Sequence, residues 1–439
     1  MSNSKTKPIT IALFKCLVWA LMFTVFIHTL SFIFAPVTGT DLMMKDMLAT
    51  EDSDLVFVGA SRTYRSFDPN LLYQNLGTNA FVLSSSGQST LDSYYLLKIF
   101  LEKNNPQIVY IDASWNRLIT ISKFSSRGIL SAMPMSRIKL EYLLNAVGIE
   151  DAYKALFPVT YYIAQDKRAF SPSQIKTNIF NKFQSSGFQM ELNGDNHYIK
   201  NGFVSSDRTV VGTKHITVLG SEFSWDSDDS PNKEALEYLR KCIELCKSKV
   251  AKVVLYSMPS PMPTMALSTG YDDYVTYLQE FALQYGLEYY DFGLAKASIF
   301  ERKNEYFYDD RHLNSRGARE FTEGFCRFWQ ARQDPAYAEE DWFYMSYEDM
   351  MRDHNDVFST WAYQTQIGIE ANSTYSPFIM PEYEFLYETA GGDVHIVQDF
   401  GKENTLSSAL IPVDAAKIIV HARAKGGSRV ETYEFPLKH

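Results

Sequence analysis

The sequence predicts an α/β protein built around a central five-stranded parallel sheet, with an apolar helix before it and a mostly β module after it. The prediction rests on two observations. Short apolar runs rich in Val, Ile, Tyr or Phe recur along the chain, and helical patterns alternate with most of them. Such alternation is typical of crossover connections between parallel strands whose sheet is covered on both faces. The expected strands are Leu55–Gly59, Ala80–Leu83, Ile108–Asp112, Lys252–Ser257 and Leu287–Asp291.

The composition fits this class of protein. A chain of 439 residues with 46% hydrophobic and 21% charged residues is globular and long enough for a large domain and a smaller one. The net charge of −10 and the lack of a basic stripe argue against a nucleic-acid partner. The expected helices of the sheet domain are Leu91–Asn104, Lys233–Lys249, Asp272–Tyr285 and Arg316–Arg332.

An apolar run from Leu17 to Ala35 is long enough for a membrane-spanning helix, which needs about 20 residues. Lys5, Lys7 and Lys15 precede it, so we expect a cytoplasmic N-terminus, a single-pass anchor in the cell membrane, and an extracytoplasmic catalytic domain. A cleaved signal peptide is the alternative, but its apolar core would be shorter, about 7–15 residues, and no small-x-small site follows directly. A buried soluble helix does not fit the nearly unbroken apolarity.

We expect three parts: residues 1–36 as tail and anchor, 37–335 as the catalytic domain with an insertion at 117–230, and 336–439 as an accessory module. The insertion carries helical patterns, a loop-like stretch and an acidic stretch. It would be either a lid or substrate-binding wall, or a peripheral decoration. These segments are Ser136–Asn145 and Asp151–Leu156, then Asn193–Asp207, then Trp225–Ser230.

The C-terminal module begins with an aromatic, acidic and partly helical segment, Glu339–Thr360. Four strand-like runs follow, and Gly391-Gly392 and Gly426-Gly427 lie between pairs of them as hairpin turns. The module would either bind a glycan or serve as a structural appendage, and fold alone does not decide between these roles. The four runs are Glu382–Thr389, Val394–Phe400, Lys417–Ala424 and Val430–Leu437.

Ser61 lies in Gly59-Ala60-Ser61-Arg62, on the turn that leaves the first predicted strand. Ligands of open α/β sheets bind at the carboxyl ends of the strands, so this serine is placed to act as a nucleophile. The small residues before it allow a sharp turn, and the turn can aim the Ser61 amide at an oxyanion. The competing interpretation is an ordinary serine that caps the following helix.

His312 follows Asp309 by three residues in Tyr308-Asp309-Asp310-Arg311-His312. One turn can aim both side chains at the same place, with Asp309 holding one imidazole nitrogen while the other faces Ser61 as general base. Asp310 is the rival acid, although its neighbour Arg311 offers it an ion pair. Two aspartates and a histidine are also metal ligands, but no further well-spaced ligand cluster exists. We therefore expect no metal and no cofactor.

Two further segments follow predicted strands and can complete an oxyanion hole. Gly87, after the second strand, can present its backbone N–H, although turn formation alone also explains a glycine there. Asn116, after the third strand, can donate a side-chain hydrogen bond, while Asp112 or Trp115 would instead line the pocket. Three arginines accompany these blocks and either bind an anionic substrate or pair with nearby acids such as Asp68 and Asp310; they are Arg62, Arg65 and Arg311.

Together these blocks resemble the four blocks of the SGNH/GDSL hydrolase superfamily: Gly-x-Ser, Gly, Asn and Asp-x-x-His, over about residues 52–332. With the apolar N-terminal run, the chain is most similar to the membrane-anchored branch that includes the teichoic-acid D-alanylation protein DltD and the alginate O-acetyltransferases. The resemblance implies a flavodoxin-like three-layer fold, with Ser61 as nucleophile, His312 as base, Asp309 as its orienting acid, and Ser61, Gly87 and Asn116 as the oxyanion hole. The chain departs from the pattern in reading Gly-Ala-Ser in the first block and in lacking Gly-x-Asn-Asp in the third.

The sequence therefore predicts a membrane-anchored serine O-acyltransferase that modifies a cell-surface glycan or teichoic-acid-like polymer. An esterase or deacetylase acting on the same polymer is the alternative. A third hypothesis is a non-catalytic partner of a membrane-bound O-acyltransferase, with which an active enzyme could also associate.

Overall fold

The computed structural model describes residues 6–119, 121, 123–148, 152–157, 159, 171–192, 194–209, 223–226, 229–249 and 251–437. Its central sheet has five parallel strands in the order β2-β1-β3-β7-β8. The predicted α/β class is confirmed, together with the apolar N-terminal helix and the β-rich C-terminal region. The strands begin and end within a residue of their expected positions: β1 (Leu55–Gly59), β2 (Ala80–Ser84), β3 (Ile108–Asp112), β7 (Lys252–Ser257) and β8 (Glu288–Asp291).

This strand order is that of flavodoxin-like sheets, in which the chain reverses its direction of winding between β1 and β3. Ligands of such sheets bind outside the carboxyl ends of the strands at this point. Short helices follow three of the strands here and hold polar side chains at the sheet edge: α3 (Ser61–Tyr64) after β1, α6 (Trp115–Leu118) after β3, and α14 (Met262–Ala266) after β7.

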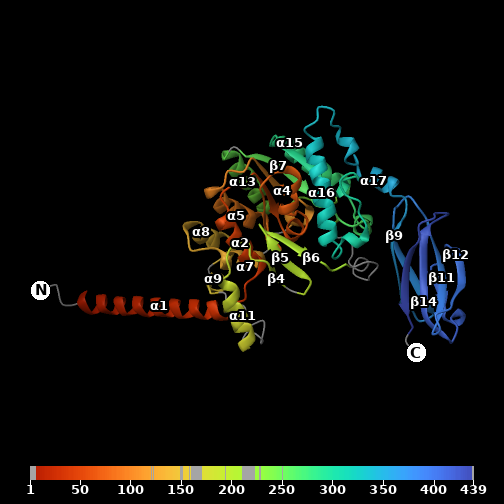
Figure 1. Ribbon diagram of the computed structural model, residues 1–439, viewed down its shortest axis with the longest axis horizontal. Coiled ribbons are helices and arrows are strands. Elements are labelled where there is room, and N and C mark those ends of the chain that lie inside the picture. Colours follow the sequence, from red (N-terminus) through yellow and green to blue (C-terminus); the bar gives the residue numbers. More distant parts are fainter. Residues whose placement is uncertain are drawn as a thin grey trace.

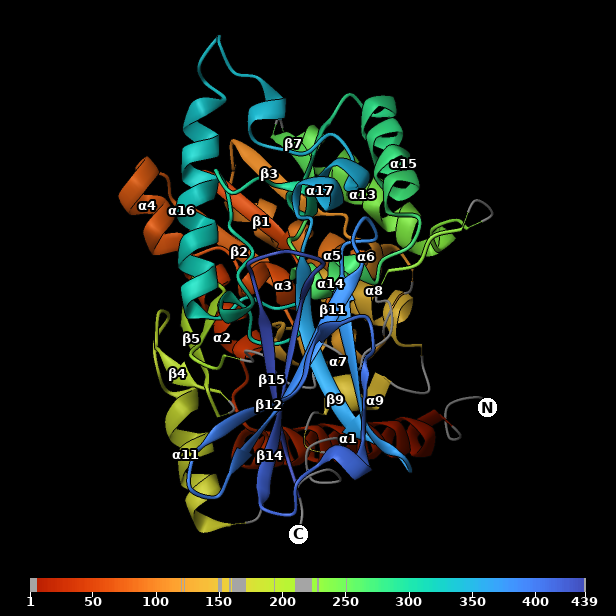
Figure 2. The same cartoon turned by 90° about the vertical axis from the view of Figure 1, so that its right-hand side faces the viewer.

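Helices cover both faces of the sheet, because alternate strand residues point to opposite sides. Val56 and Val58 pack in one core and Leu55 and Phe57 in the other. The first core is shared with α2 (Gly39–Ala49), α5 (Thr90–Lys103), α13 (Lys233–Ser248) and α15 (Tyr271–Gln284). The second is shared with α4 (Pro69–Leu76) and α16 (Ser315–Ala331), and Figure 2 shows these two helices on the opposite side of the strands from α13 and α15. The four predicted helices of the sheet domain are confirmed.

The insertion is more regular than the sequence indicated. Its described helices are α7 (Lys123–Ala132), α8 (Arg137–Ala146), α9 (Ala152–Leu156) and α11 (Pro172–Lys182). The prediction of a loop over Asn193–Asp207 is wrong, since β5 (Asn196–Lys200) and β6 (Phe203–Ser206) form a hairpin there beside β4 (Met190–Glu191). Asn201 and Gly202 turn it with positive φ angles of 49° and 86°, the Asn-Gly pair that tight hairpins favour. Asp151, residue 193 and residues 227–228 of the expected segments lie outside the described residues.

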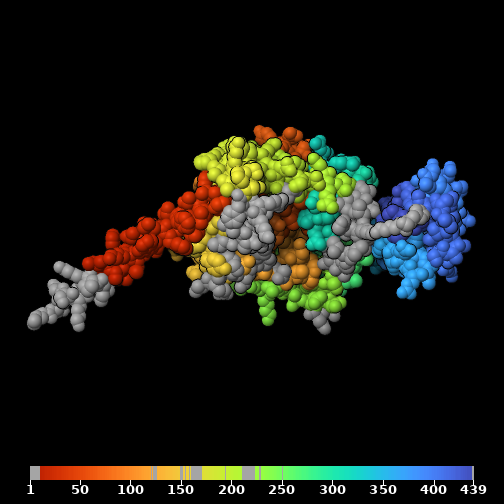
Figure 3. Space-filling model, turned by 90° about the horizontal axis from the view of Figure 1, so that it is seen from below, coloured from red at the N-terminus to blue at the C-terminus, as the bar shows by residue number. Residues whose placement is uncertain are grey.

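The N-terminal helix α1 (Thr6–Phe34) projects away from the body of the molecule (Figures 1 and 3). Its 25 residues Thr10–Phe34 have the length and apolarity of a membrane span or a signal sequence, and an apolar stretch of 18 residues within them has no buried residue. Lys5 lies outside the described residues. Helix α11 holds the end of α1, because Asn178 Nδ2 donates to the Phe34 carbonyl at 3.0 Å and Lys182 Nζ donates to the Phe32 carbonyl at 2.6 Å.

The C-terminal region has its own apolar core between two antiparallel sheets, and it lies at the opposite end of the molecule from α1 (Figures 1 and 3). The four predicted strands are β11 (Pro381–Thr389), β12 (Val394–Gly401), β14 (Ala415–Ala424) and β15 (Glu431–Pro436). The sequence missed the second sheet, whose strands are β9 (Val357–Gln364), β10 (Gly368–Tyr375) and β13 (Thr405–Ser407). Within the segment Glu339–Thr360, only α17 (Tyr347–Asp353) and a 3-10 turn, Glu339–Asp341, are helical before β9 begins.

Candidate active site

Ser61 is the first residue of α3, directly after the turn that leaves β1. The turn is tight, since a Cβ on Gly59 would lie 1.9 Å from Oγ1 of Thr63. Two other strands of the sheet fix it: Ser84 Oγ, at the end of β2, donates to the Ala60 carbonyl at 2.6 Å, and Thr63 Oγ1 lies 2.9 Å from the Tyr256 hydroxyl of β7. These contacts fix the position of the backbone that carries Ser61.

His312 lies in a loop that leads into α16. The residues flanking the loop, Phe307 and Leu313, form an antiparallel bridge that closes it at its base. Asn314 then caps α16 by accepting from the Gly317 amide at 3.0 Å. A second contact fixes the loop from outside, because Thr264 Oγ1 of α14 donates to the Asp310 carbonyl at 2.8 Å.

The structure brings Ser61, His312 and Asp309 together in one hydrogen-bonded chain. His312 Nε2 lies 2.7 Å from Ser61 Oγ, and Nδ1 lies 2.8 Å from Oδ2 of Asp309. The backbone amides of Arg311 and His312 both donate to Asp309 Oδ1, at 3.0 and 2.8 Å. These bonds orient the carboxylate, which in turn holds the imidazole with Nε2 toward the serine. This is the geometry that a serine nucleophile, a general base and an orienting acid require.

The electrostatics suit the same roles. Burial would raise the pKa of Asp309, but the hydrogen bond and charge of His312 and the two backbone amides lower it to about 2, so the carboxyl is ionised at neutral pH. For His312, burial lowers the pKa below the ordinary 6.5, and the charges of Arg65 and Arg62 lower it further against the opposing effect of Asp309. The imidazole is therefore neutral at neutral pH and free to accept a proton.

The three oxyanion candidates have different surroundings. The Ser61 amide belongs to the first turn of α3, where N–H groups have no partner within the helix. Gly87 lies in an exposed turn after β2 with a φ of 64°, a conformation that favours glycine. Asn116 lies on α6 and lines a cavity beside Arg62. The structure thus places all three at the carboxyl edge of the sheet and gives Asn116 a direct position on a cavity.

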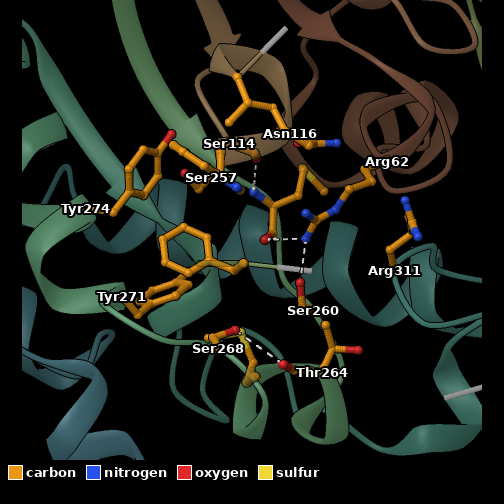
Figure 4. Close-up of a pocket in the computed structure, with 15 residues that line it drawn as sticks. Arg62, Ser114, Asn116, Ser257, Ser260, Thr264, Ser268, Tyr271, Tyr274 and Arg311 are labelled. Carbon is orange, nitrogen blue, oxygen red and sulfur yellow. Dashed lines mark hydrogen bonds between the residues drawn. The ribbon is translucent and has the colours of Figure 1, made fainter. Parts of the chain in front are cut away.

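This cavity, of about 210 Å³, lies over the carboxyl ends of β3 and β7 (Figure 4). Its wall includes Trp115, and the Trp115 ring packs against Phe223 with centroids 5.7 Å apart. Phe223 belongs to the insertion, so a described part of the insertion forms a wall of this cavity. Asp112 does not line it, because that carboxylate is buried, accepts from the Ser114 amide at 2.9 Å and pairs with Arg117 at 3.8 Å.

The three arginines have separate environments. Arg62 lines the cavity and is clamped, with Nη2 donating to the carbonyls of Met258 at 2.8 Å and Pro259 at 2.9 Å. Arg311 also lines it, and it forms the expected ion pair with Asp310 at 3.1 Å. Arg65 is buried elsewhere and donates to Asn196 Oδ1 at 2.7 Å. Asp68 caps α4, since its side chain accepts from the Asn70 amide.

Sequence reasoning missed the segment after β7. Ser257, Met258 and Ser260 line the cavity, and Ser260 Oγ accepts from Arg62 Nη2 at 2.8 Å. The signal was available, because this segment follows a predicted parallel strand and must therefore lie at the same sheet edge as Ser61.

No family model matches the chain, and a search of curated proteins finds no match. Among solved structures, the chain is similar to a candidate acylhydrolase from Bacteroides fragilis, with 11% identity over 65% of this chain and 88% of that chain and a TM-score of 0.29. It is also similar to a GDSL-like lipase from Bacteroides thetaiotaomicron, with 10% identity over 64% and 89% of the two chains and a TM-score of 0.28. Because both scores are low, the interpretation of the site rests on its own geometry.

Proposed function

We propose that this protein is a membrane-anchored, extracytoplasmic serine O-acyltransferase that modifies a cell-surface glycan or teichoic-acid-like polymer through an acyl-enzyme. The observation that carries the proposal is the hydrogen-bonded chain from Ser61 through His312 to Asp309. A non-catalytic partner of a membrane-bound O-acyltransferase would have no need of this chain. The resemblance to the SGNH/GDSL hydrolases supports the same chemistry, and we propose the anchored acyltransferase branch within that superfamily.

In the proposed reaction Ser61 Oγ attacks the acyl carbonyl while its proton passes to His312 Nε2. The leaving-group oxygen then takes this proton as the C–O bond breaks, and the acyl group remains esterified to Ser61. An acceptor hydroxyl next gives its proton to His312 and attacks the acyl-enzyme. Collapse of this second intermediate transfers the acyl group and returns the proton to Ser61. Asp309 stabilises the imidazolium that forms in each step.

The charge on the carbonyl oxygen in each intermediate needs donors that are already in place. We propose that the amides of Ser61 and Gly87 and the side chain of Asn116 supply them. Arg62 and Arg311 would bind an anionic acceptor from the cavity that they line, and Trp115 would form its apolar wall.

The exposed, apolar α1 supports anchoring, since about 20 apolar residues suffice to cross a bilayer. Lys7 and Lys15 precede most of the span, so we propose that the N-terminus is cytoplasmic and that the parts we assign to 37–335 and 336–439 lie outside. A reporter active only outside the cytoplasm, fused after the last residue, should give signal. Activity of a reporter that works only in the cytoplasm would contradict this topology.

Transfer is favoured over hydrolysis because a tether keeps the site beside the membrane, where acyl donors and nascent polymers meet. The deciding experiment replaces Ser61 or His312 by alanine in the cell and measures the acyl content of the surface polymer. We expect acylation to be lost, and we expect only weak hydrolysis of small soluble esters by the purified protein. Efficient hydrolysis of the polymer esters by the purified protein, with acylation rising in the Ser61→Ala strain, would assign the protein as an esterase or deacetylase instead.

A further inference from the structure

A second cavity, of about 450 Å³, lies on the other side of Ser61. The first cavity lies over β3 and β7, whereas this one is lined by Ser84, Ser85 and Ser86 at the end of β2. Because β1 lies between β2 and β3, the two cavities flank the nucleophile that follows β1. Tyr64 and Arg65, three and four residues after Ser61, line the second cavity.

Arg65 is the unusual residue of this cavity. This residue is only 8% exposed, and its Nη2 donates to Asn196 Oδ1 at 2.7 Å. The guanidinium also packs over the Tyr308 ring, 4.2 Å from the centroid. The Nε and Nη1 donors are shielded from solvent, and neither has a hydrogen-bond partner among the residues that the structure describes.

Arg117, another buried arginine, has a compensating carboxylate, because it pairs with Asp112 at 3.8 Å. Arg65 forms no ion pair within the described residues. A buried cation without a counter-charge is costly, so the environment of Arg65 is complete only when an anion is present.

A second donor points to the same conclusion. Ser85 is 3% exposed, and within the described part of the chain its Oγ has no hydrogen-bond partner. It lines the same cavity as Arg65. A planar arginine fork with a nearby hydroxyl matches the oxygen atoms of a phosphate or carboxylate group.

One side of the lining is apolar and continuous with the N-terminal helix. Val37, Leu192 and Val204 line the cavity, as does Pro36, which follows the end of α1 by two residues. Two residues of chain span at most about 7 Å, so this wall begins at the end of the apolar helix. Thr38 and Asp41 form a capping box at the start of α2, which fixes the connection.

We propose that this second cavity binds the anionic head group of a membrane amphiphile, with Arg65 and Ser85 holding a phosphate-like group and the Val37 side of the cavity accepting the first part of the apolar chain. Binding requires only the cavity and the anchor. That the bound amphiphile exchanges an acyl group with Ser61 is a further step, which rests on the proposed function.

The test uses the full-length protein in an uncharged detergent and measures binding by calorimetry. The probes are dodecyl phosphate, inorganic phosphate and dodecanol. We expect dodecyl phosphate to bind at least about tenfold more tightly than either of the others, because both ends of the cavity contribute. Arg65→Gln should weaken its binding about tenfold or more, and Ser85→Ala by a smaller factor. Arg316→Gln is the matched control and should leave binding unchanged, because Arg316 is exposed and pairs with Glu305.

Equal binding of dodecyl phosphate to the wild type, Arg65→Gln and Ser85→Ala would overturn the proposal. Inorganic phosphate binding as tightly as dodecyl phosphate would replace the amphiphile by a free anion and would also overturn it. Ser85→Ala keeps the test valid if Arg65→Gln fails to fold. Labelling of Ser61 by a fluorophosphonate is measured in parallel: labelling without amphiphile binding refutes only this inference, whereas binding without labelling refutes only the catalytic proposal.

Discussion

The described part of the chain holds two histidine–carboxylate pairs with the same separation in two different regions. His312 Nδ1 lies 2.8 Å from Asp309 at the edge of the parallel sheet, and His421 Nδ1 lies 2.8 Å from Glu384 in the C-terminal region. Among the described residues, only His312 has a serine oxygen, Ser61 Oγ, within hydrogen-bond distance of its second ring nitrogen. A histidine and an acid alone therefore do not make a catalytic site; a third group, brought in from a distant element, is also required.

The supporting structure differs as well. Asp309 accepts two backbone amides and lies in a loop closed by the Phe307–Leu313 bridge, so its geometry is fixed from several sides. Glu384 and His421 are instead opposite each other on the paired strands β11 and β14. A cross-strand pair of this kind stabilises a sheet modestly. Chemistry is therefore expected at the sheet edge and not in the C-terminal region.

The largest expected effect comes from removing the serine. Ser61→Ala should lower the rate of acyl-enzyme formation by about 10³-fold or more, because it removes the oxygen that His312 activates and that carries the acyl group in the proposed reaction. The measurement is the initial burst of nitrophenol released from a p-nitrophenyl ester by the full-length protein. A burst of undiminished size in Ser61→Ala would move the nucleophile to another residue.

Asp309→Asn should be nearly as damaging. The amide cannot stabilise the imidazolium and can leave His312 in the wrong tautomer, which we expect to cost about 10³- to 10⁴-fold in turnover. Asp310→Asn is the matched control at the neighbouring position. It breaks only a partly exposed ion pair with Arg311 and should cost less than about tenfold. Equal losses in the two variants would contradict the assignment of Asp309.

The pH dependence reports on His312 directly. Only the neutral imidazole accepts the serine proton, so activity should rise with pH through the pKa of His312 and then level off. Since burial and the charges of Arg65 and Arg62 lower this pKa, the midpoint should lie below 6.5. Arg65→Gln removes one of these charges and should move the midpoint upward. A kcat/KM profile with a midpoint above 6.5, or a downward shift in Arg65→Gln, would contradict this description.

Gly59→Ala should lower the free energy of unfolding. The new Cβ would lie 1.9 Å from Thr63 Oγ1 and 2.7 Å from Thr63 Cβ, so α3 must shift, at a cost of about 1–3 kcal/mol. Gly128→Ala on α7 meets no atom within 4 Å and should be neutral or stabilising by up to about 1 kcal/mol. Thermal unfolding of both variants checks the pair, and equal melting temperatures would show that the turn has room.

The smallest expected effect belongs to the second histidine pair. His421→Ala should leave the ester burst unchanged and should alter the free energy of unfolding by about 1 kcal/mol or less, as expected for a partly exposed pair. A loss of activity approaching that of Ser61→Ala would mean that the C-terminal region takes part in catalysis.

The sequence predicted the parts of this molecule whose signal is local. The five strands are short buried runs, and the spacing from Asp309 to His312 fits within one closed loop. The Asn201-Gly202 pair that turns the hairpin is also a local signal, but the polar residues around it make the two strands hard to recognise in the sequence.

What could not be predicted depends on contacts between distant elements. The sequence around Arg62 and Arg65 gives no reason to expect different surroundings for the two side chains. In the structure, Arg62 donates to carbonyl groups almost 200 residues away, whereas Arg65 donates to Asn196 on the hairpin. The positions of Gly87 and Asn116 relative to a substrate likewise depend on how neighbouring turns pack, which no local pattern encodes.

The most direct measurement identifies the residue that reacts with a fluorophosphonate. The full-length protein is labelled at neutral pH, digested and analysed by mass spectrometry. We predict a single modified site at Ser61, slow labelling in His312→Ala, and normal labelling in His421→Ala. Modification of a different residue, or labelling of Ser61 at an unchanged rate in His312→Ala, would contradict the proposed catalytic chain.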